Sequence, residues 1–315
     1  MNIYSNLGGL IIKHILTLKE LSEHEIGDIV IEGMKVKKQP EDYYSALEKK
    51  GLLLMFQKTS TRTTLSYQSA INQLGGYAVE LDWDKSNFTI SPIQYESRYA
   101  SRNCDIMMAR LKKFSDIVEL AKYSSVPVIN GCCDKYHPSQ ALADMMTIYE
   151  IKKQFDGVTL TFAGIHNNVT NSLIIAALKL GVKLQLVTPM INEASWDKEL
   201  MEEAKKSGNI IHLSGLEAAL ATTDFIYTDT WVDMEYFNDP MYDKEKQTRI
   251  EQMSPYSITM ENLKGYTPYI MHDMPVHPGF EIEEDLIESE NSIIYTQAEN
   301  RMHAQKALLM HLLMK

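Results

Sequence analysis

Short apolar runs typical of β-strands alternate with helix-patterned stretches along most of this 315-residue chain. In the first half, strands are expected at 52–56, 77–81, 105–109 and 126–130, and helices at 61–74 and 115–123. After a long helical stretch from about 137 to 155, the rhythm restarts with strands at 158–164, 183–187, 209–213 and 224–229, and helices near 168–180 and 197–206. Alternating strands and helices are typical of parallel sheets covered by helices on both faces. The sequence therefore predicts an α/β fold with two doubly wound parallel-sheet domains.

No low-complexity linker separates the two halves, so the boundary is placed near the long helix that follows residue 137. We assign residues 1–148 to the first domain and residues 149–296 to the second. Interdomain helices are expected to join them, and the helical stretch at 297–315 is expected to pack back on the first domain.

Composition and charge narrow the class of partner. The net charge is -11, which argues against nucleic acid or a membrane surface as the main partner but leaves room for a local basic pocket. The three cysteines form no CxxC pair, so neither a disulfide framework nor a zinc site is expected, and a reducing cytoplasm fits. No apolar run is long enough for a signal peptide or a membrane span, so we expect a cytoplasmic protein.

A cluster of hydroxyl side chains with one arginine and no acid lies between the strand ending at Phe56 and the next helix. Ser60 and Thr61 are placed at N-cap positions, where hydroxyls and unpaired backbone N–H groups converge. Arg62 adds a planar charge suited to phosphate oxygens, and the helix dipole has the same sign. The stretch therefore indicates an anion site, although a well-capped helix with solvated threonines explains it equally well.

Further polar residues follow other predicted strands. Arg110 comes directly after an apolar strand, His137 and Gln140 open a helix, and polar groups end the strand within 269–278. In open α/β sheets ligands bind at the carboxyl ends of the strands. Taken singly, Arg110 could be a surface residue and His137 a neighbour of a helix cap; together they favour one binding site.

Seven stretches in order along the chain resemble the ornithine and aspartate transcarbamylase family, and the ornithine branch fits better. They are Ser60-Thr61-Arg62-Thr63, Arg110, His137-Pro138-x-Gln140, Asn167-Asn168, TDTWVDM at 228–234, His272-x-x-Pro275 and QAENRMHAQKAL at 297–308.

The resemblance implies transfer of a carbamoyl group from carbamoyl phosphate to the side-chain amine of ornithine or a related basic amino acid, giving citrulline or an analogue and phosphate. It implies a homotrimer with shared active sites, a carbamoyl-phosphate-binding first domain and an amine-binding second domain. No cofactor and no metal are implied.

The resemblance also assigns roles to residues. Catalytic roles fall to Arg62, Arg110 and His137, and we add Asp273 from its own chemistry, because it departs from the family pattern. Carbamoyl phosphate contacts fall to Ser60, Thr61, Arg62, Thr63, Arg110, His137, Gln140, Met274 and Arg301. Amine contacts fall to Asn167, Asn168, Asp229 and Met234, and we add Asp233, which departs from the family pattern, as a partner for an ammonium group of the substrate. The Asn167 pair also suits a helix cap, a role compatible with binding a substrate carboxylate.

Departures from the family pattern leave the acceptor open. Asp273-Met274 stands where the ornithine enzymes carry Cys-Leu, and Asp233-Met234 where they carry Ser-Met. Asp273 is therefore either a general base for the attacking amine or a binder of a second charge. Lysine or a diamine such as putrescine suits the added negative charge, while the Asn167 pair favours an amino acid.

Two other departures concern the phosphate side. Thr64 stands where a second arginine is usual, and the loop at 82–92 lacks the usual glutamine-containing pattern. Lys85, Ser86, Asn87 and Thr89 are candidates for the contact with a neighbouring subunit.

Two other classes compete with this interpretation. A nucleotide-binding dehydrogenase is disfavoured because the chain has neither GxGxxG nor a P-loop. A non-catalytic relative that binds a metabolite or a partner stays open because of the altered residues.

Overall fold

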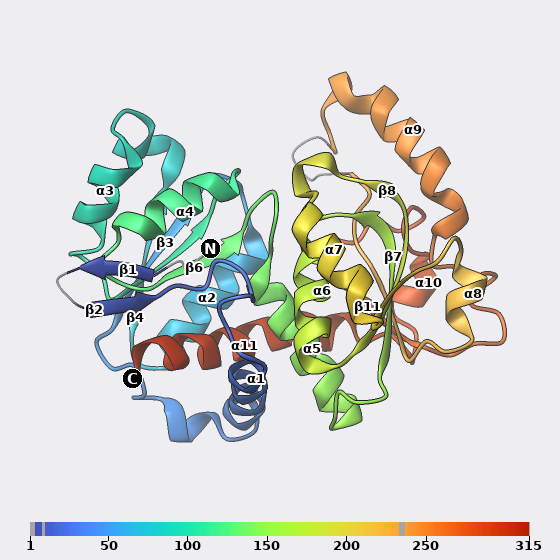
Figure 1. Cartoon of the computed structure of the whole chain (residues 1–315), viewed down its shortest axis with the longest axis horizontal. Helices are drawn as coiled ribbons and strands as arrows, with labels where there is room; N and C mark the ends of the chain where they lie inside the picture. The colour runs from blue at the N-terminus through green and yellow to red at the C-terminus, as the bar shows by residue number, and fades with distance from the viewer. Residues whose placement is uncertain (1–3, 8–9, 233–236, 315) are drawn as a thin grey trace. The chain divides into compact units, whose positions relative to one another are not determined.

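The computed structural model describes residues 4–7, 10–232 and 237–314. Contacts between residues divide the chain into two compact units, one formed by Met1–Glu150 with Asn300–Lys315 and the other by Ile151–Glu299. Figure 1 shows the elements of both units, coloured along the chain. In the described part of the chain, no helix combines the length and the apolar character needed to cross a bilayer.

The first unit is built on a four-stranded parallel sheet with strand order β4-β3-β5-β6. Its strands are β3 (Gly51–Phe56), β4 (Tyr77–Asp82), β5 (Ile106–Arg110) and β6 (Val128–Cys132). Every residue of β3 is buried, as expected for a central parallel strand covered on both faces. β4 is an edge strand, and its residues are exposed except for the half-buried Ala78 and Leu81.

Helices and short 3-10 turns surround this sheet (Figure 1). They are α1 (Glu23–Lys38), η1 (Pro40–Tyr43), α2 (Thr61–Gln73), η2 (Trp83–Lys85), η3 (Asn87–Thr89), α3 (Ile93–Ala100), α4 (Phe114–Tyr123) and α5 (Pro138–Lys152). An antiparallel hairpin of β1 (Tyr4–Leu7) and β2 (Leu10–Lys13) precedes them.

The second unit carries a five-stranded parallel sheet with strand order β11-β10-β7-β8-β9. Its strands are β7 (Thr159–His166), β8 (Lys183–Ile191), β9 (Ile210–His212), β10 (Phe225–Thr228) and β11 (Tyr269–His272). The accompanying helices are α6 (Asn168–Leu180), η4 (Glu193–Ser195), α7 (Lys198–Ser207), α8 (Leu216–Leu220), η5 (Pro240–Tyr242), α9 (Asp243–Met253), η6 (Ser254–Tyr256) and α10 (Glu284–Ile287).

The C-terminal helix α11 (Ile294–Leu313), red in Figure 1, belongs to the first unit from Asn300 onward. Within that unit Lys306 donates to the side chain of Gln73 at 2.5 Å, and the Asn300 amide donates to the Thr147 hydroxyl at 2.9 Å. The predicted fold class, two parallel-sheet domains with a C-terminal helix returning to the first, is confirmed. Which substrate each domain binds stays a prediction.

Candidate active site

The hydroxyl-rich stretch after β3 forms a capped helix start. Ser60 has extended backbone angles and is the N-cap of α2, and its hydroxyl accepts from the Thr63 N–H at 3.3 Å. Thr61, which was also placed at a cap position, is the first residue of the helix. The first turn contains no acidic residue, so the partial positive charge of the helix start is not neutralised from within the turn. This geometry favours an anion.

Two guanidinium groups converge on the buried hydroxyl of Thr63. Arg110 ends β5 opposite Phe56 of β3, which places it at the carboxyl edge of the sheet beside the start of α2. Its Nη1 donates to Thr63 Oγ1 at 3.4 Å, and Nη2 of Arg301 from α11 donates to the same oxygen at 3.0 Å. One hydroxyl thus brings together residues from three separate parts of the sequence.

The Gln140 side chain is held at both ends of its amide. Its oxygen accepts from Nη1 of Arg301, and its nitrogen donates to Asp144 Oδ1 at 2.8 Å. Gln140 and Asp144 lie one turn apart on α5, where side chains four positions apart face each other. The amide orientation is therefore fixed, with one N–H still directed elsewhere.

His137 lies directly before α5 and is 4% exposed. Burial lowers the pKa of this imidazole well below 6.5, and the nearby charges of Arg301, Arg110 and Arg62 lower it further. His137 is therefore neutral at pH 7 and offers one N–H donor and one acceptor. All three arginines therefore lie near enough to His137 for their charges to act on it.

These groups form a cationic cluster within the first unit, defined as Arg62, Arg110, His137, Gln140 and Arg301 at the start of α2. Preorganised donors of this kind stabilise a phosphate and the negative charge that develops on a carbonyl oxygen under attack. Of the residues predicted for carbamoyl phosphate, all except Met274 belong to this unit.

In the second unit, Asn167 joins a helix start to a carboxylate. Its side-chain oxygen caps α6 by accepting from Val169 N–H at 3.0 Å and Thr170 N–H at 3.1 Å. Its amide nitrogen donates to Asp229 Oδ2 at 2.5 Å, just after β10. The other oxygen of Asp229 accepts from the N–H of Thr230 at 2.6 Å. The expected cap role of Asn167 is thus accompanied by orientation of the Asp229 carboxylate, while Asn168 is the first residue of α6.

The turn after β11 carries Asp273 and Met274. The N–H of Met274 donates to Nδ1 of His272 at 2.8 Å, and Met274 has a φ of 62°, uncommon for a residue with a side chain. Asp273 Oδ1 lies 3.7 Å from the same Nδ1. Because Nδ1 accepts the Met274 hydrogen bond and carries no proton, this contact is not an ion pair.

Several predicted residues stand apart from these groups. Asp233 and Met234 lie outside the described residues. In the loop at 82–92, Trp83 stacks on Phe88 with ring centres 4.3 Å apart, and the exposed Lys85 pairs with Asp82 at 2.8 Å. Which loop residue contacts a neighbouring subunit stays a prediction.

Sequence reasoning missed residues that hold the site in place. Asp144 orients Gln140, and the four-residue spacing in the sequence is a signal that would have revealed it. Glu281 is completely buried and contacts His272 and the backbone of His277. No local pattern marks Glu281, because its role depends on how the turn after β11 folds back.

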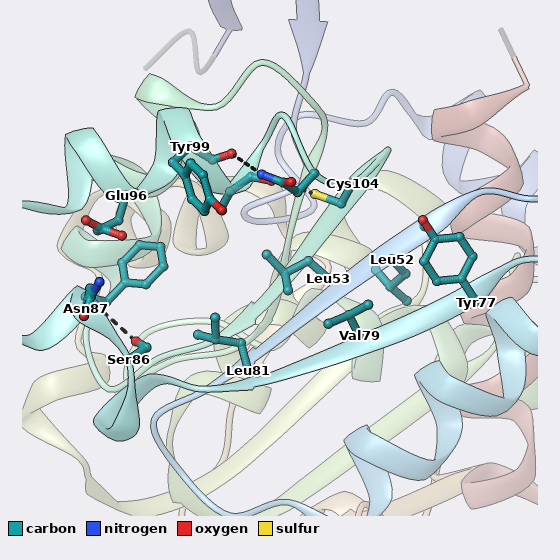
Figure 2. A pocket seen from close by; sticks show the side chains of 14 residues that line it. Leu52, Leu53, Tyr77, Val79, Leu81, Ser86, Asn87, Glu96, Tyr99 and Cys104 are labelled. Carbon is teal, nitrogen blue, oxygen red and sulfur yellow. Dashed lines mark hydrogen bonds between the residues drawn. The ribbon is translucent and has the colours of Figure 1, made fainter.

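Pockets of two kinds lie in the first unit. One of about 570 Å³ opens at Ser60 and Thr61 and is also lined by Lys58, Glu80 and Lys85, so it adjoins the helix start. The other, of about 420 Å³, is lined mainly by apolar side chains of β3, β4 and α3 (Figure 2). This apolar pocket shares no lining residue with the cationic cluster. Among the described residues, no group of three His, Cys, Asp or Glu side chains is arranged to hold a metal ion.

Comparison with known proteins matches almost the whole chain. Residues 13–150 match the family profile described as aspartate/ornithine carbamoyltransferase, carbamoyl-P binding domain, and residues 156–312 match the profile for the Asp/Orn binding domain. The chain belongs to the aspartate/ornithine carbamoyltransferase family. The predicted resemblance is confirmed.

Similar members of this family are ornithine carbamoyltransferases. The enzyme of Archaeoglobus fulgidus is 37% identical over 312 residues, covering 96% of this chain and 98% of its own. The solved structure of the Pyrococcus furiosus ornithine carbamoyltransferase has a TM-score of 0.87 at 36% identity, covering 96% of this chain and 97% of its own. The anabolic ornithine carbamoyltransferase of Campylobacter jejuni has a TM-score of 0.85 at 31% identity, covering 96% and 99%.

Proposed function

We propose that this protein transfers the carbamoyl group of carbamoyl phosphate to the side-chain amine of ornithine or a related basic amino acid, releasing phosphate. The observation that carries the proposal is the cationic cluster, in which Arg110 and Arg301 converge on Thr63 beside the start of α2. It lies in the part of the chain that matches the carbamoyl-P binding profile. The second unit, which matches the Asp/Orn binding profile, would bind the amine.

The cluster suits the charge changes of the reaction. As the amine attacks, negative charge develops on the carbonyl oxygen and then leaves with the phosphate. The α2 start, with Ser60 and Arg62, would hold the phosphate, and Arg110 with the neutral His137 would donate to the carbonyl oxygen. Gln140 would orient the carbamoyl amide. No covalent nucleophile is required.

The amine must lose a proton before it attacks. An alkyl ammonium has a pKa of about 10.4, so freeing its lone pair at pH 7 costs about 4 to 5 kcal/mol. Asp273, at the turn after β11, is proposed to accept that proton. Asp229, oriented by Asn167, would bind the second ammonium group of the substrate.

The test supplies carbamoyl phosphate with ornithine, lysine, putrescine, aspartate and N-acylated ornithines, and measures ureido product and phosphate. We expect equal amounts of both products with ornithine or with another basic amine. If none of these amines gives ureido product and phosphate although carbamoyl phosphate still binds, the result would instead support a non-catalytic family member.

Asp273→Asn tests the proposed base. Turnover should fall by on the order of 100-fold or more, within the usual contribution of a general base, while the Kd for carbamoyl phosphate stays within about twofold. Asp224→Asn is the matched control, because Asp224 precedes β10 in the same unit and pairs with Lys152 away from the carboxyl ends of the strands. Unchanged turnover in Asp273→Asn would refute the assignment.

A homotrimer is proposed to form through the apolar pocket of the first unit. Its β4 wall exposes Tyr77 and Val79, the latter 51% exposed, and Tyr99 of α3 is 69% exposed on the opposite side (Figure 2). Contiguous exposed apolar side chains around a hollow are typical of protein interfaces. A cytoplasmic location is proposed because Cys104, Cys132 and Cys133 are free thiols, which suit a reducing compartment.

A further inference from the structure

A completely buried carboxylate lies behind the candidate amine site of the second unit. Glu281 is 0% exposed, and its Oε1 accepts from the backbone N–H of His277 at 2.5 Å and contacts Nε2 of His272 at 3.1 Å. Its Oε2 lies 3.8 Å from Nδ1 of His277. Burying a carboxylate is costly, and an apolar residue of similar size often packs equally well. The carboxylate therefore calls for a role beyond packing.

Hydrogen bonds select one protonation form of His272. Its Nδ1 accepts the N–H of Met274 at 2.8 Å, so the proton of the neutral ring is on Nε2. That proton is donated to Glu281, which fixes both the tautomer and the plane of the ring. His272 in turn holds the backbone of the turn that carries Asp273. Glu281 thus acts on one side of the candidate amine site.

Hydrogen bonds also select the form of His277. The hydroxyl proton of Thr230 is donated to the Val232 carbonyl at 2.8 Å, so Thr230 Oγ1 accepts at its 2.9 Å contact with His277 Nδ1. The proton of the neutral His277 is therefore on Nδ1. Burial lowers the pKa of His277, which favours this neutral form, and the ring of Phe237 stacks on it at 3.9 Å with an interplanar angle of 9°.

The two histidines face different loops. His272 is the last residue of β11 and holds the turn that follows it, whereas His277 contacts Thr230, which follows Asp229 in the segment after β10. Thr230 also donates its N–H to Asp229. Through these contacts Glu281 is connected to both carboxylates that the proposed function assigns to the amine, although it contacts neither.

We propose that Glu281 is a positioning residue that holds the two amine-binding loops at a fixed spacing, acting through His272 on one loop and through His277 on the other. The inference rests on the proposed function, because it assigns Asp229 and Asp273 to amine binding. Misplacing a reacting group by about 1 Å costs on the order of 100-fold in rate, so a fixed spacing matters for turnover.

The test compares Glu281→Leu, which removes the acceptor, with Glu281→Gln, which keeps one acceptor oxygen. In Glu281→Leu the KM for ornithine should rise by at least about tenfold and kcat should fall, whereas Glu281→Gln should recover much of the loss. The Kd for carbamoyl phosphate should change much less than the KM for ornithine, because Met274 is the one predicted contact of that site on this turn and the others belong to the first unit. A merely structural role would lower the active fraction but leave the KM unchanged.

Thr230→Val removes the contact between the Thr230 hydroxyl and His277 without altering Glu281. This variant tests the proposal even if Glu281→Leu does not fold. Thr230→Val should raise the KM for ornithine, as Glu281→Leu does. The control Asp224→Asn should leave this KM unchanged. An unchanged KM in Thr230→Val would overturn the proposal, as would an unchanged KM in folded Glu281→Leu.

Imidazole 15N NMR supplies a readout that needs no turnover. Wild-type protein should show the Nε2–H tautomer for His272 and the Nδ1–H tautomer for His277, and the reverse pattern would overturn the proposal. Wild-type protein that is inert towards every amine would contradict the proposed function, while the tautomers would still decide the role of Glu281.

Discussion

Arg301→Met tests whether the cationic cluster binds carbamoyl phosphate while leaving the rest of the fold in place. Arg301 is buried on α11, donates to Thr63 and Gln140, and comes first among the charges that lower the pKa of His137. At about 5 Å from a phosphate charge, with an effective dielectric constant of about 20, one guanidinium contributes about 3 kcal/mol. Its loss should weaken carbamoyl phosphate binding by on the order of 100-fold.

Stability should change much less than affinity in this variant. Removing Arg301 leaves the Gln140 oxygen without that donor, at a cost of about 1 to 3 kcal/mol, but it also removes a buried charge close to two other arginines. The assay is calorimetric titration with carbamoyl phosphate and with inorganic phosphate, accompanied by thermal unfolding. The pKa of His137, followed by NMR, should rise because its largest positive neighbour is gone.

Arg102→Met is the matched control for the same loss of charge. Arg102 is exposed after α3 and donates to the Arg98 carbonyl at 2.7 Å, outside the cluster. Its affinity for carbamoyl phosphate should stay within about twofold of wild type. If Arg301→Met also binds within twofold while folded, the assignment of this cluster to carbamoyl phosphate is refuted.

Two other predictions concern protonation and assembly. Because the pKa of His137 lies well below 6.5, its ring stays neutral from pH 6 to 8. The affinity for carbamoyl phosphate should therefore show no change near pH 6.5 that is due to His137. A change in affinity near pH 6.5 that disappears in His137→Asn would contradict this account. Val79→Lys places a charge on the exposed apolar face of β4 and should dissociate the proposed trimer in sedimentation velocity. Ile31→Lys, at an exposed apolar residue of α1, is the control, and a trimer that persists in Val79→Lys would exclude this interface.

The strands and the capped helix starts were predictable because their signals are local. β3 is a continuous apolar run, and Ser60 follows it directly with hydroxyl side chains typical of a helix start. The same local signals placed α6 after Asn167. The order of strands within each sheet, by contrast, depends on contacts between distant segments.

Some of the elements that sequence analysis missed lack such signals, and others carry signals that were overlooked. α9 is almost entirely polar, with Met253 as its buried residue, so it shows no apolar periodicity. α1 does carry a capping box in which Ser22 and Glu25 bond each other's backbone, a pattern that the sequence displays. The hairpin of β1 and β2 also went unpredicted.

Site residues could be predicted where the signal is local in the sequence, and their contacts could not where the partners are distant in the sequence. Most first-unit residues were singled out by their places after predicted strands, and the resemblance added Arg301. The shared acceptor at Thr63 emerged only when Arg110 and Arg301 met in the fold. The partner of Asp229 was equally hidden, because Asn167 lies far from it in sequence. The role of Glu281 depends on two histidines whose tautomers are set by backbone and hydroxyl groups, which no sequence pattern displays.

A crystal structure of this protein with carbamoyl phosphate bound tests the central claim most directly. The account predicts phosphate oxygens about 3 Å from the first backbone N–H groups of α2 and from Arg62, with His137 contacting the carbamoyl end of the same molecule. Carbamoyl phosphate bound elsewhere, or Arg62 and His137 too far apart to contact one molecule, would contradict it.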